Sequence, residues 1–283
     1  MSRTTAVVLA GSRPGSDPLA KAFGTDLKAL VPIGGKPMVR WPVETLLGCE
    51  RFSQVRVLAQ EPERIGAVLP VDPKLVVERS AGSIAATLER LCFDPSVQWP
   101  LFVTTADHVL LDEGMVDEFC DLGELADIAI GVVERDNLMR RLPQSQRTWI
   151  HFRSGAFSGA NLFLLGGKKV LPALELWRSV EHDRKKAWAL LWAFGPINFL
   201  AAALRLRTIH ETLDRIGDKL GVKVEAVDLS DPLSAVDVDK LTDHDVVEQL
   251  LAERESRSSR AKSRDRGVST ALDTNGSGAQ PND

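Results

Sequence analysis

The chain has 283 residues, of which 44% are hydrophobic, and this is enough to bury the core of one large domain. Its net charge of −4 argues against a protein that attracts nucleic acid by its overall charge, so we expect no nucleic-acid partner. The three cysteines are far apart and form no C-x-x-C pair, which indicates reduced thiols rather than a disulfide or zinc framework. The first apolar stretch is too short for a signal peptide, so we expect a cytoplasmic protein.

Short apolar runs alternate with helical patterns along most of the chain. The runs predict strands over residues 6–9, 54–58, 74–77, 101–104, 127–133, 157–165 and 223–228. Helices are predicted between them, for example over residues 37–47, 83–91 and 113–120. This alternation predicts an α/β fold of three layers, α/β/α, with a mostly parallel, Rossmann-like sheet.

The first predicted strand runs directly into the loop Gly11-Ser12-Arg13-Pro14-Gly15. Glycine lets backbone N–H groups approach an anion without a Cβ clash, and arginine binds phosphate oxygens in a fork. The loop is neither a Walker A motif nor a G-x-G-x-x-G dinucleotide fingerprint, since neither string occurs. It therefore predicts a phosphate-binding loop of another α/β class.

Asp107 follows the buried strand 101–104. The carboxyl ends of strands face the ligand crevice of an open α/β sheet, and a carboxylate there suits Mg²⁺. The alternative is that Asp107 only caps the next helix.

Two strings in the first forty residues resemble the opening of a known superfamily. Residues 9–13 (LAGSR) resemble its L-x-A-G-G-x-G-x-R motif loosely, and residues 28–38 (KALVPIGGKPM) resemble its K-x-L-[LV]-x-[IV]-x-G-[KR]-P-[ML] motif closely. The chain resembles the MobA-like NTP transferases and sugar-1-phosphate nucleotidyltransferases, which have a GT-A-like fold. The resemblance covers about residues 5–165 and 222–250. It departs in having fewer glycines before Arg13 and a longer stretch from Arg13 to Lys28.

The resemblance implies a triphosphate site and a metal site. A nucleoside triphosphate would bind over the first loop, with Lys28 against the α-phosphate. The residues assigned to this nucleotide are Ala10, Gly11, Ser12, Arg13, Lys28, Gly82 and Ser83, the last two at the base. Catalytic roles fall to Lys28, Arg13 and Asp107.

The second metal ligand comes from residues 236–243, which resemble the family's late D-[IV]-[DN]-T-P-E-D-L motif. Asp107 and Asp239 would hold the Mg²⁺, with Asp237 as a neighbour on the same strand face. The alternative makes Asp237 and Asp239 solvated turn carboxylates. Asp243 is a candidate N-cap for the final helix.

Three other residues could belong to the site, but each also has a simpler explanation. Ser83 has the position of a helix cap as well as of a base contact. Asn161, in the glycine-rich stretch 154–161, would either bind the acceptor or form a turn. His108 beside Asp107 is at best a neighbour of the site, because attack by a phosphate oxygen needs no base.

Residues 168–221 predict a helical, acceptor-side insertion that carries three of the six tryptophans. We favour a buried helical subdomain; peripheral membrane contact through residues 184–207, at the inner face of the membrane, and a membrane span are the alternatives. The predicted domain is residues 1–251. Residues 252–283 are rich in Arg, Ser and Gly and predict a disordered tail, either simply solvated or in contact with an anionic surface.

These observations predict a Mg²⁺-dependent nucleotidyltransferase. It would transfer NMP from an NTP, with CTP or GTP favoured, to a phosphorylated acceptor and release pyrophosphate. One alternative is a GT-A glycosyltransferase using a nucleotide sugar, although the central strand offers only Asp107 and the D-x-D string Asp237-Val238-Asp239 comes late in the chain. The other is a non-catalytic nucleotide-binding protein on the same fold.

Overall fold

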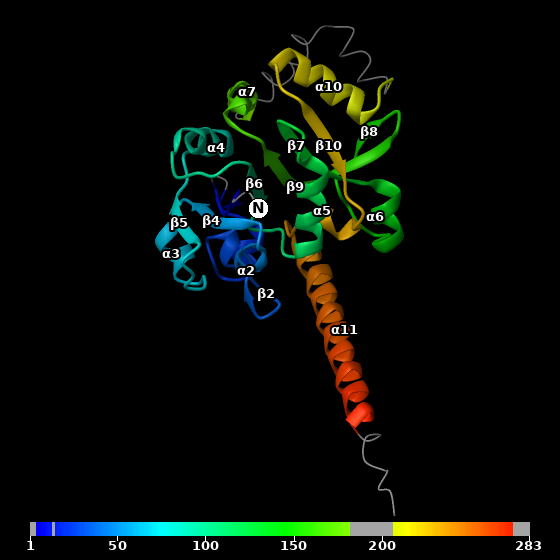
Figure 1. Ribbon diagram of the computed structural model, residues 1–283. Helices are drawn as coiled ribbons and strands as arrows, with labels where there is room; N and C mark the ends of the chain where they lie inside the picture. The colour runs from blue at the N-terminus through cyan, green and yellow to red at the C-terminus, as the bar shows by residue number, and fades with distance from the viewer. Residues whose placement is uncertain (1–3, 13–14, 182–205, 274–283) are drawn as a thin grey trace, which may run out of the picture.

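A central sheet with helices on both faces makes up the body of the protein (Figure 1). The computed structural model describes residues 4–12, 15–181 and 206–273. The strands of the sheet are β1 (Thr4–Leu9), β4 (Phe52–Ala59), β5 (Leu75–Arg79), β6 (Leu101–Thr105), β7 (Ile128–Glu134), β8 (Ile150–Phe152), β9 (Gly155–Leu165) and β10 (Val224–Asp228).

The strands follow the order β10-β7-β9-β6-β1-β4-β5, and β8 pairs with β9. The central strand β9 is antiparallel to β6 and β7, while β1 is parallel to both β4 and β6. The predicted mostly parallel sheet is therefore confirmed. All seven predicted strands are present with bounds within two residues, because runs that are buried on both faces read as continuous apolar stretches.

Helices and short turns connect the strands. The α-helices are α1 (Pro18–Ala22), α2 (Arg40–Gly48), α3 (Pro62–Gly66), α4 (Ile84–Phe93), α5 (Glu113–Gly123), α6 (Arg135–Arg141), α7 (Leu171–Glu181), α10 (Ile209–Leu220) and α11 (Leu241–Asp273). The 3-10 turns are η1 (Lys28–Leu30), η2 (Lys168–Val170) and η3 (Pro232–Ala235), and β2 (Pro32–Ile33) forms a small hairpin with β3 (Lys36–Pro37).

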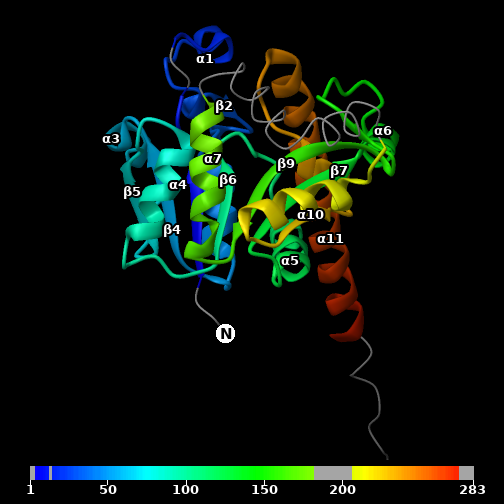
Figure 2. The same cartoon turned by 90° about the horizontal axis from the view of Figure 1, so that it is seen from above.

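The two faces of the sheet bury separate apolar clusters, as the alternation of side chains along a strand requires. Val8 of β1 points into the cluster shared with α2, α5 and the first turns of α11. Its neighbour Val7 points into the cluster shared with α4 and α7, against which α10 also packs. In Figure 2, α4, α7 and α10 lie in front of the strands. The three-layer prediction is confirmed.

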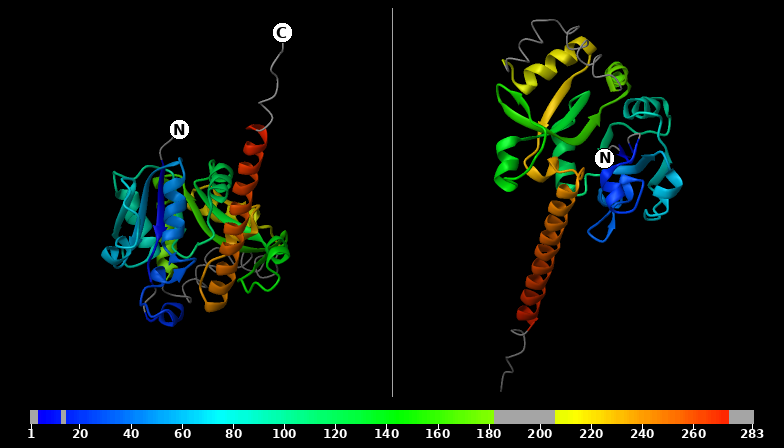
Figure 3. Two further views of the ribbon diagram at one scale, coloured as in Figure 1. Left: turned by 90° about the horizontal axis from the view of Figure 1, so that it is seen from below. Right: turned by 180° about the vertical axis from the view of Figure 1, so that it is seen from behind.

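The C-terminal segment differs from the sequence expectation. We predicted an unstructured tail from residue 252, whereas α11 continues to Asp273 and projects away from the sheet (Figure 3). Side-chain contacts hold the helix at the point where the tail was predicted to begin. Arg254 donates to Leu110 O (2.7 Å) and pairs with Asp112, and Glu253 pairs with Arg257 one turn on. Residues 274–283 lie outside the described part.

The predicted insertion is helical where it is described. Helix α7 begins it and α10 ends it, and Trp177 of α7 packs against Phe163 of β9 with ring centroids 5.9 Å apart. Trp188, Trp192 and most of the 184–207 segment fall outside the described residues. Among the described helices, none has the length and apolar character needed to cross a membrane.

Candidate active site

The phosphate-loop candidate and the first carboxylate candidate lie at one edge of the sheet. β1 and β6 are parallel neighbours, with Leu9 in register with Thr105. The chain after β6 stays tied to β1, since Ala106 N donates to Leu9 O at 3.0 Å. The loop after Leu9 and the carboxylate of Asp107 therefore meet at the carboxyl edge, where ligands bind in α/β sheets.

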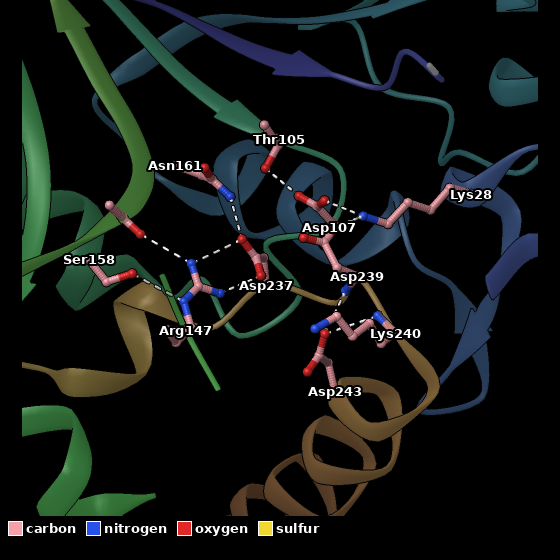
Figure 4. Close-up of polar contacts among 11 residues, drawn as sticks. Lys28, Thr105, Asp107, Arg147, Ser158, Asn161, Asp237, Asp239, Lys240 and Asp243 are labelled. Atoms are coloured by element: carbon pink, nitrogen blue, oxygen red, sulfur yellow. Dashed lines mark hydrogen bonds and ion pairs between the residues drawn. The ribbon is translucent and has the colours of Figure 1, made fainter. Parts of the chain in front are cut away.

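Lys28 lies between two carboxylates from distant parts of the chain (Figure 4). Its Nζ donates to Asp107 Oδ2 at 2.6 Å and also contacts Asp239 Oδ1. Thr105 Oγ1 donates to the other oxygen of Asp107. The side chains of Lys28 and Asp107 are 17% and 18% exposed, while Asp239 is 59% exposed. The ammonium group of Lys28 thus joins Asp107 and Asp239, so three of the four residues that the resemblance assigned to catalysis and metal binding lie together.

The protonation state of Lys28 follows from these neighbours. Burial alone would lower the pKa of Lys28, but the charges and hydrogen bonds of Asp107 and Asp239 outweigh it and raise the pKa above its usual value. Lys28 therefore carries a fixed positive charge at this edge of the sheet.

Asp107 does not cap the next helix. The N-cap of α5 is Asp112, whose side chain accepts from Met115 N at 3.0 Å. The helix-cap interpretation of Asp107 is therefore wrong, and its carboxylate is directed to Lys28.

Asp239 is held by the backbone around it. Val238, which is fully buried, donates its N–H to Asp107 O at 3.2 Å. The side chain of Asp243 accepts from the N–H groups of Asp239 (3.1 Å) and Lys240 (2.9 Å). Asp243 stands inside the first turn of α11 and reaches back, so it stabilises the helix start without being the N-cap we predicted.

Asp237 has a different partner from Asp239. Residues 236–239 are irregular rather than a strand, and Asp237 turns to Arg147, which binds both of its carboxylate oxygens. Asn161 Nδ2 donates to Asp237 Oδ2 at 2.9 Å from a backbone with φ of 52°. The side chain of Asp237 is 14% exposed, so the solvated-turn interpretation is wrong for this residue. Burial and the charges of Asp107 and Asp239 raise the pKa of Asp237, and Arg147 opposes this shift.

The described part of the first loop is held by Gln60, a residue that no motif in the sequence indicates. Gln60, just after β4, accepts from Ser12 N (2.7 Å) and donates to Ser12 O (2.9 Å). Ala10 is 4% exposed and donates its N–H to Leu58 O at 2.9 Å. Gly11 leaves room for the Gln60 amide, because a Cβ there would lie 3.3 Å from Gln60 Nε2. Arg13 lies outside the described residues.

The proposed base-contacting turn is a capped helix start. Ser83 is the N-cap of α4, and its Oγ accepts from Ala86 N at 3.2 Å. The buried Thr87 stabilises the turn, since its Oγ1 accepts from Ala81 N (2.9 Å) and donates to Ala81 O (2.7 Å). The cap interpretation of Ser83 is therefore confirmed, while the base contact of Gly82 and Ser83 stays a prediction.

A cleft of about 820 Å³ opens beside Asp239. Its walls come from the loop after α6, from β9 and from the start of α11. Among the side chains that line it are Arg147, Ser158, Asn161, Asp237, Asp239 and Lys240. His108, the neighbour of Asp107 in the chain, is 1% exposed, and burial lowers its pKa to about 4, so it is neutral near pH 7.

The chain matches a family model described as "MobA-like NTP transferase domain" over residues 6–205. A structure titled as a hypothetical transferase from Thermus thermophilus has a TM-score of 0.72 and 31% identity, covering 86% of this chain and 99% of that chain. The 4-diphosphocytidyl-2C-methyl-D-erythritol synthase of Anaerococcus prevotii (TM-score 0.57, 9% identity, 89% and 96% coverage) shares the fold. So does the 2-C-methyl-D-erythritol 4-phosphate cytidylyltransferase of Francisella tularensis (TM-score 0.52, 11% identity, 87% and 99% coverage). A search of curated proteins finds no significant sequence match. The family model spans more than half of the sequence, and the chain belongs to the MobA-like NTP transferase family.

Proposed function

We propose that the protein is a Mg²⁺-dependent nucleotidyltransferase that transfers NMP from an NTP to a phosphorylated acceptor. The observation that carries this proposal is the convergence of Lys28, Asp107 and Asp239 beside the Gly11 loop. The three residues come from separate segments and meet where a triphosphate on that loop would present its α-phosphate.

The residues around the site fit a divalent ion. Asp107 and Asp239 offer hard oxygen donors to one cation, and the ammonium group of Lys28 marks the place between them. Within the described residues no group of three His, Cys, Asp or Glu side chains could hold a metal. Mg²⁺ fits such a pair, since it is usually bound through one or two carboxylates and the substrate phosphates. When bound it would supply charge neutralisation on the phosphates.

The reaction is an in-line substitution at phosphorus. An oxygen of the acceptor phosphate forms a bond to the α-phosphorus, the bond to the α–β bridging oxygen breaks, and pyrophosphate leaves with the electron pair. Lys28 would stabilise the negative charge that grows on the α-phosphate oxygens. The acceptor phosphate is already ionised, so no general base is needed and the neutral His108 has no proton to take.

The cleft beside Asp239 is our candidate for the acceptor site. It opens next to the carboxylate that would face the attacking phosphate, and hydroxyl and amide side chains of Ser158 and Asn161 line it. The family resemblance favours CTP or GTP as donor, bound with its base at Gly82 and Ser83 and its phosphates over residues 10–13.

Pyrophosphate release is the direct test. The full chain is incubated with each of the four NTPs, Mg²⁺ and a panel of acceptors: hexose 1-phosphates, polyol phosphates, cofactor phosphates and a prenyl phosphate. We expect release with one NTP and one acceptor class, and loss of it in Asp107→Asn. A Mg²⁺-dependent rise in the melting temperature with the same NTP would identify the nucleobase that the protein selects.

The same experiment separates the two alternatives. A glycosyltransferase would be stabilised by a nucleotide sugar and would release no pyrophosphate. The structure gives that alternative little support, because Asp237 of the D-x-D string is paired with Arg147 rather than aligned with Asp239. A binding protein would show the thermal shift without turnover.

Peripheral membrane contact through residues 184–207 or the basic tail, in a cytoplasmic protein, remains part of the proposal. Co-sedimentation with anionic vesicles tests it, and we expect binding that weakens as salt rises.

A further inference from the structure

Most of the hydrogen-bond donors of Arg147 bind other atoms of the protein. Its Nη1 and Nη2 bind the two oxygens of Asp237, Nη2 also donates to Gly159 O (3.2 Å), and Nε donates to Ser158 Oγ (3.3 Å). These contacts use four of the five N–H donors of a guanidinium group. The side chain is 17% exposed, although it lines the cleft. Because most of its donors already bind protein atoms, Arg147 is better suited to holding protein segments together than to binding a ligand.

The segment that Arg147 holds is the one that carries the second metal-ligand candidate. Asp237 and Asp239 flank Val238, whose N–H is bound to Asp107 O at 3.2 Å. A fixed Asp237 and a tethered Val238 leave the backbone before Asp239 little freedom. The carboxylates of Asp107 and Asp239 are therefore placed relative to each other by Val238, and Val238 by the Arg147–Asp237 pair.

Asn161 is a second partner of the same carboxylate. It donates to Asp237 Oδ2 at 2.9 Å, and Arg147 reaches the neighbouring Ser158 and Gly159 of β9. Through these contacts, Arg147 and Asn161 anchor residues 236–239 to β9, a central strand of the sheet. A central strand is a rigid support for a loop that carries a ligand residue.

We infer that Arg147 is a positioning residue that fixes Asp239 for metal binding by holding Asp237. The inference rests on the proposed function, because it concerns the same metal site. Partners that orient metal ligands typically change metal affinity about 10–100-fold when altered. Arg147 variants should accordingly weaken metal binding more than they weaken acceptor binding, although Arg147 lines the candidate acceptor cleft.

The test is a Mn²⁺ titration of the full-length protein with the donor NTP present and no acceptor, followed by electron paramagnetic resonance of free Mn²⁺. Arg147→Lys keeps the positive charge but loses the bidentate contact with the carboxylate of Asp237, so we expect the Mn²⁺ affinity to fall about tenfold. The KM for the acceptor should change less than the Mn²⁺ affinity does. Arg153→Lys is the matched control, since Arg153 forms an exposed ion pair with Glu211 (3.0 Å). It should leave Mn²⁺ affinity unchanged.

A second variant pair separates positioning from folding. Arg147→Gln leaves the buried carboxylate of Asp237 without its cation and should lower the melting temperature clearly. Combining it with Asp237→Asn removes the unpaired charge, so the melting temperature should recover. The Mn²⁺ affinity should remain low in the double variant, because the contact between Arg147 and Asp237 that holds residues 236–239 is still missing. Recovery of Mn²⁺ affinity together with the melting temperature would mean that Arg147 only stabilises the fold.

Two other results overturn the inference. One is unchanged Mn²⁺ affinity in Arg147→Lys; the other is a raised acceptor KM with metal binding intact, which would make Arg147 an acceptor contact. In both cases the metal site itself survives if Asp107→Asn and Asp239→Asn still abolish Mn²⁺ binding. If wild-type protein shows no Mn²⁺ binding that depends on these two aspartates, the proposed function fails and the inference fails with it.

Discussion

The ammonium group of Lys28 lies 2.6 Å from Oδ2 of Asp107, although the two residues are 79 positions apart in the chain. Asp239, which contacts the same ammonium group, is 211 positions away from Lys28. The positive charge of Lys28 lies between two carboxylates and reduces the repulsion between them. The same arrangement keeps Lys28 protonated, as its proposed contact with the α-phosphate requires.

Replacing Lys28 with methionine should reduce turnover strongly. Loss of one group that stabilises developing negative charge typically costs about 10²–10³ in kcat, and we expect a loss of this size. Steady-state pyrophosphate release measures it. Lys36→Met is a matched control in the same sequence motif, since Lys36 pairs with Glu44 rather than with the carboxylates of the site. Equal losses of activity in both variants would contradict the role assigned to Lys28.

The sequence indicated Lys28, Asp107 and Asp239 through short strings that a resemblance can match. It did not indicate Arg147 or Gln60, because their importance comes from contacts with residues 90 and 48 positions away and neither lies in a motif. Strands were predicted well, since each is a local apolar run. The irregular course of residues 236–239 was not, because alternating Val and Asp residues read as a strand until the long-range partners of Asp237 and Val238 are known.

Gln60 should affect nucleotide binding more than turnover. Its amide both donates to and accepts from the backbone of Ser12, so Gln60→Glu loses the donor and places a negative charge beside the proposed triphosphate loop. We expect the KM for NTP to rise about tenfold, which corresponds to about 1.4 kcal/mol, with kcat nearly constant. Gln249→Glu makes the same change at an exposed position of α11. A fall in kcat with unchanged KM would show that the loop is not held in this way.

Burial of His108 should make the protein less stable in mild acid. The unfolded chain binds a proton at this histidine below about pH 6.5, whereas burial lowers the pKa in the folded protein to about 4. The unfolded state therefore binds more protons in this window, and the free energy of unfolding falls as the pH falls. From pH 7.5 to pH 5 this single group would remove about 2 kcal/mol.

Urea denaturation at pH 7.5 and pH 5 checks the His108 prediction. His108→Gln has no group to titrate and should reduce the difference between the two pH values by about 2 kcal/mol. His151→Gln, at an exposed histidine, should keep the wild-type difference. An unchanged pH dependence in His108→Gln would assign the acid sensitivity to other groups.

Gly34 should tolerate no side chain, because it is enclosed between two elements that support the site. It has φ of +54°, and a Cβ there would lie 2.6 Å from Cζ2 of Trp41 and 2.7 Å from Cδ1 of Leu251 in α11. Gly34→Ala combines backbone strain with overpacking, so we expect unfolding to become easier by about 3 kcal/mol. Gly35 has φ of +76°, and a Cβ at that position would meet no atom within 4 Å, so Gly35→Ala suffers the strain alone, about 1 kcal/mol. Urea midpoints compare the two, and equal losses would mean that the contact with Trp41 and Leu251 does not restrict the hairpin.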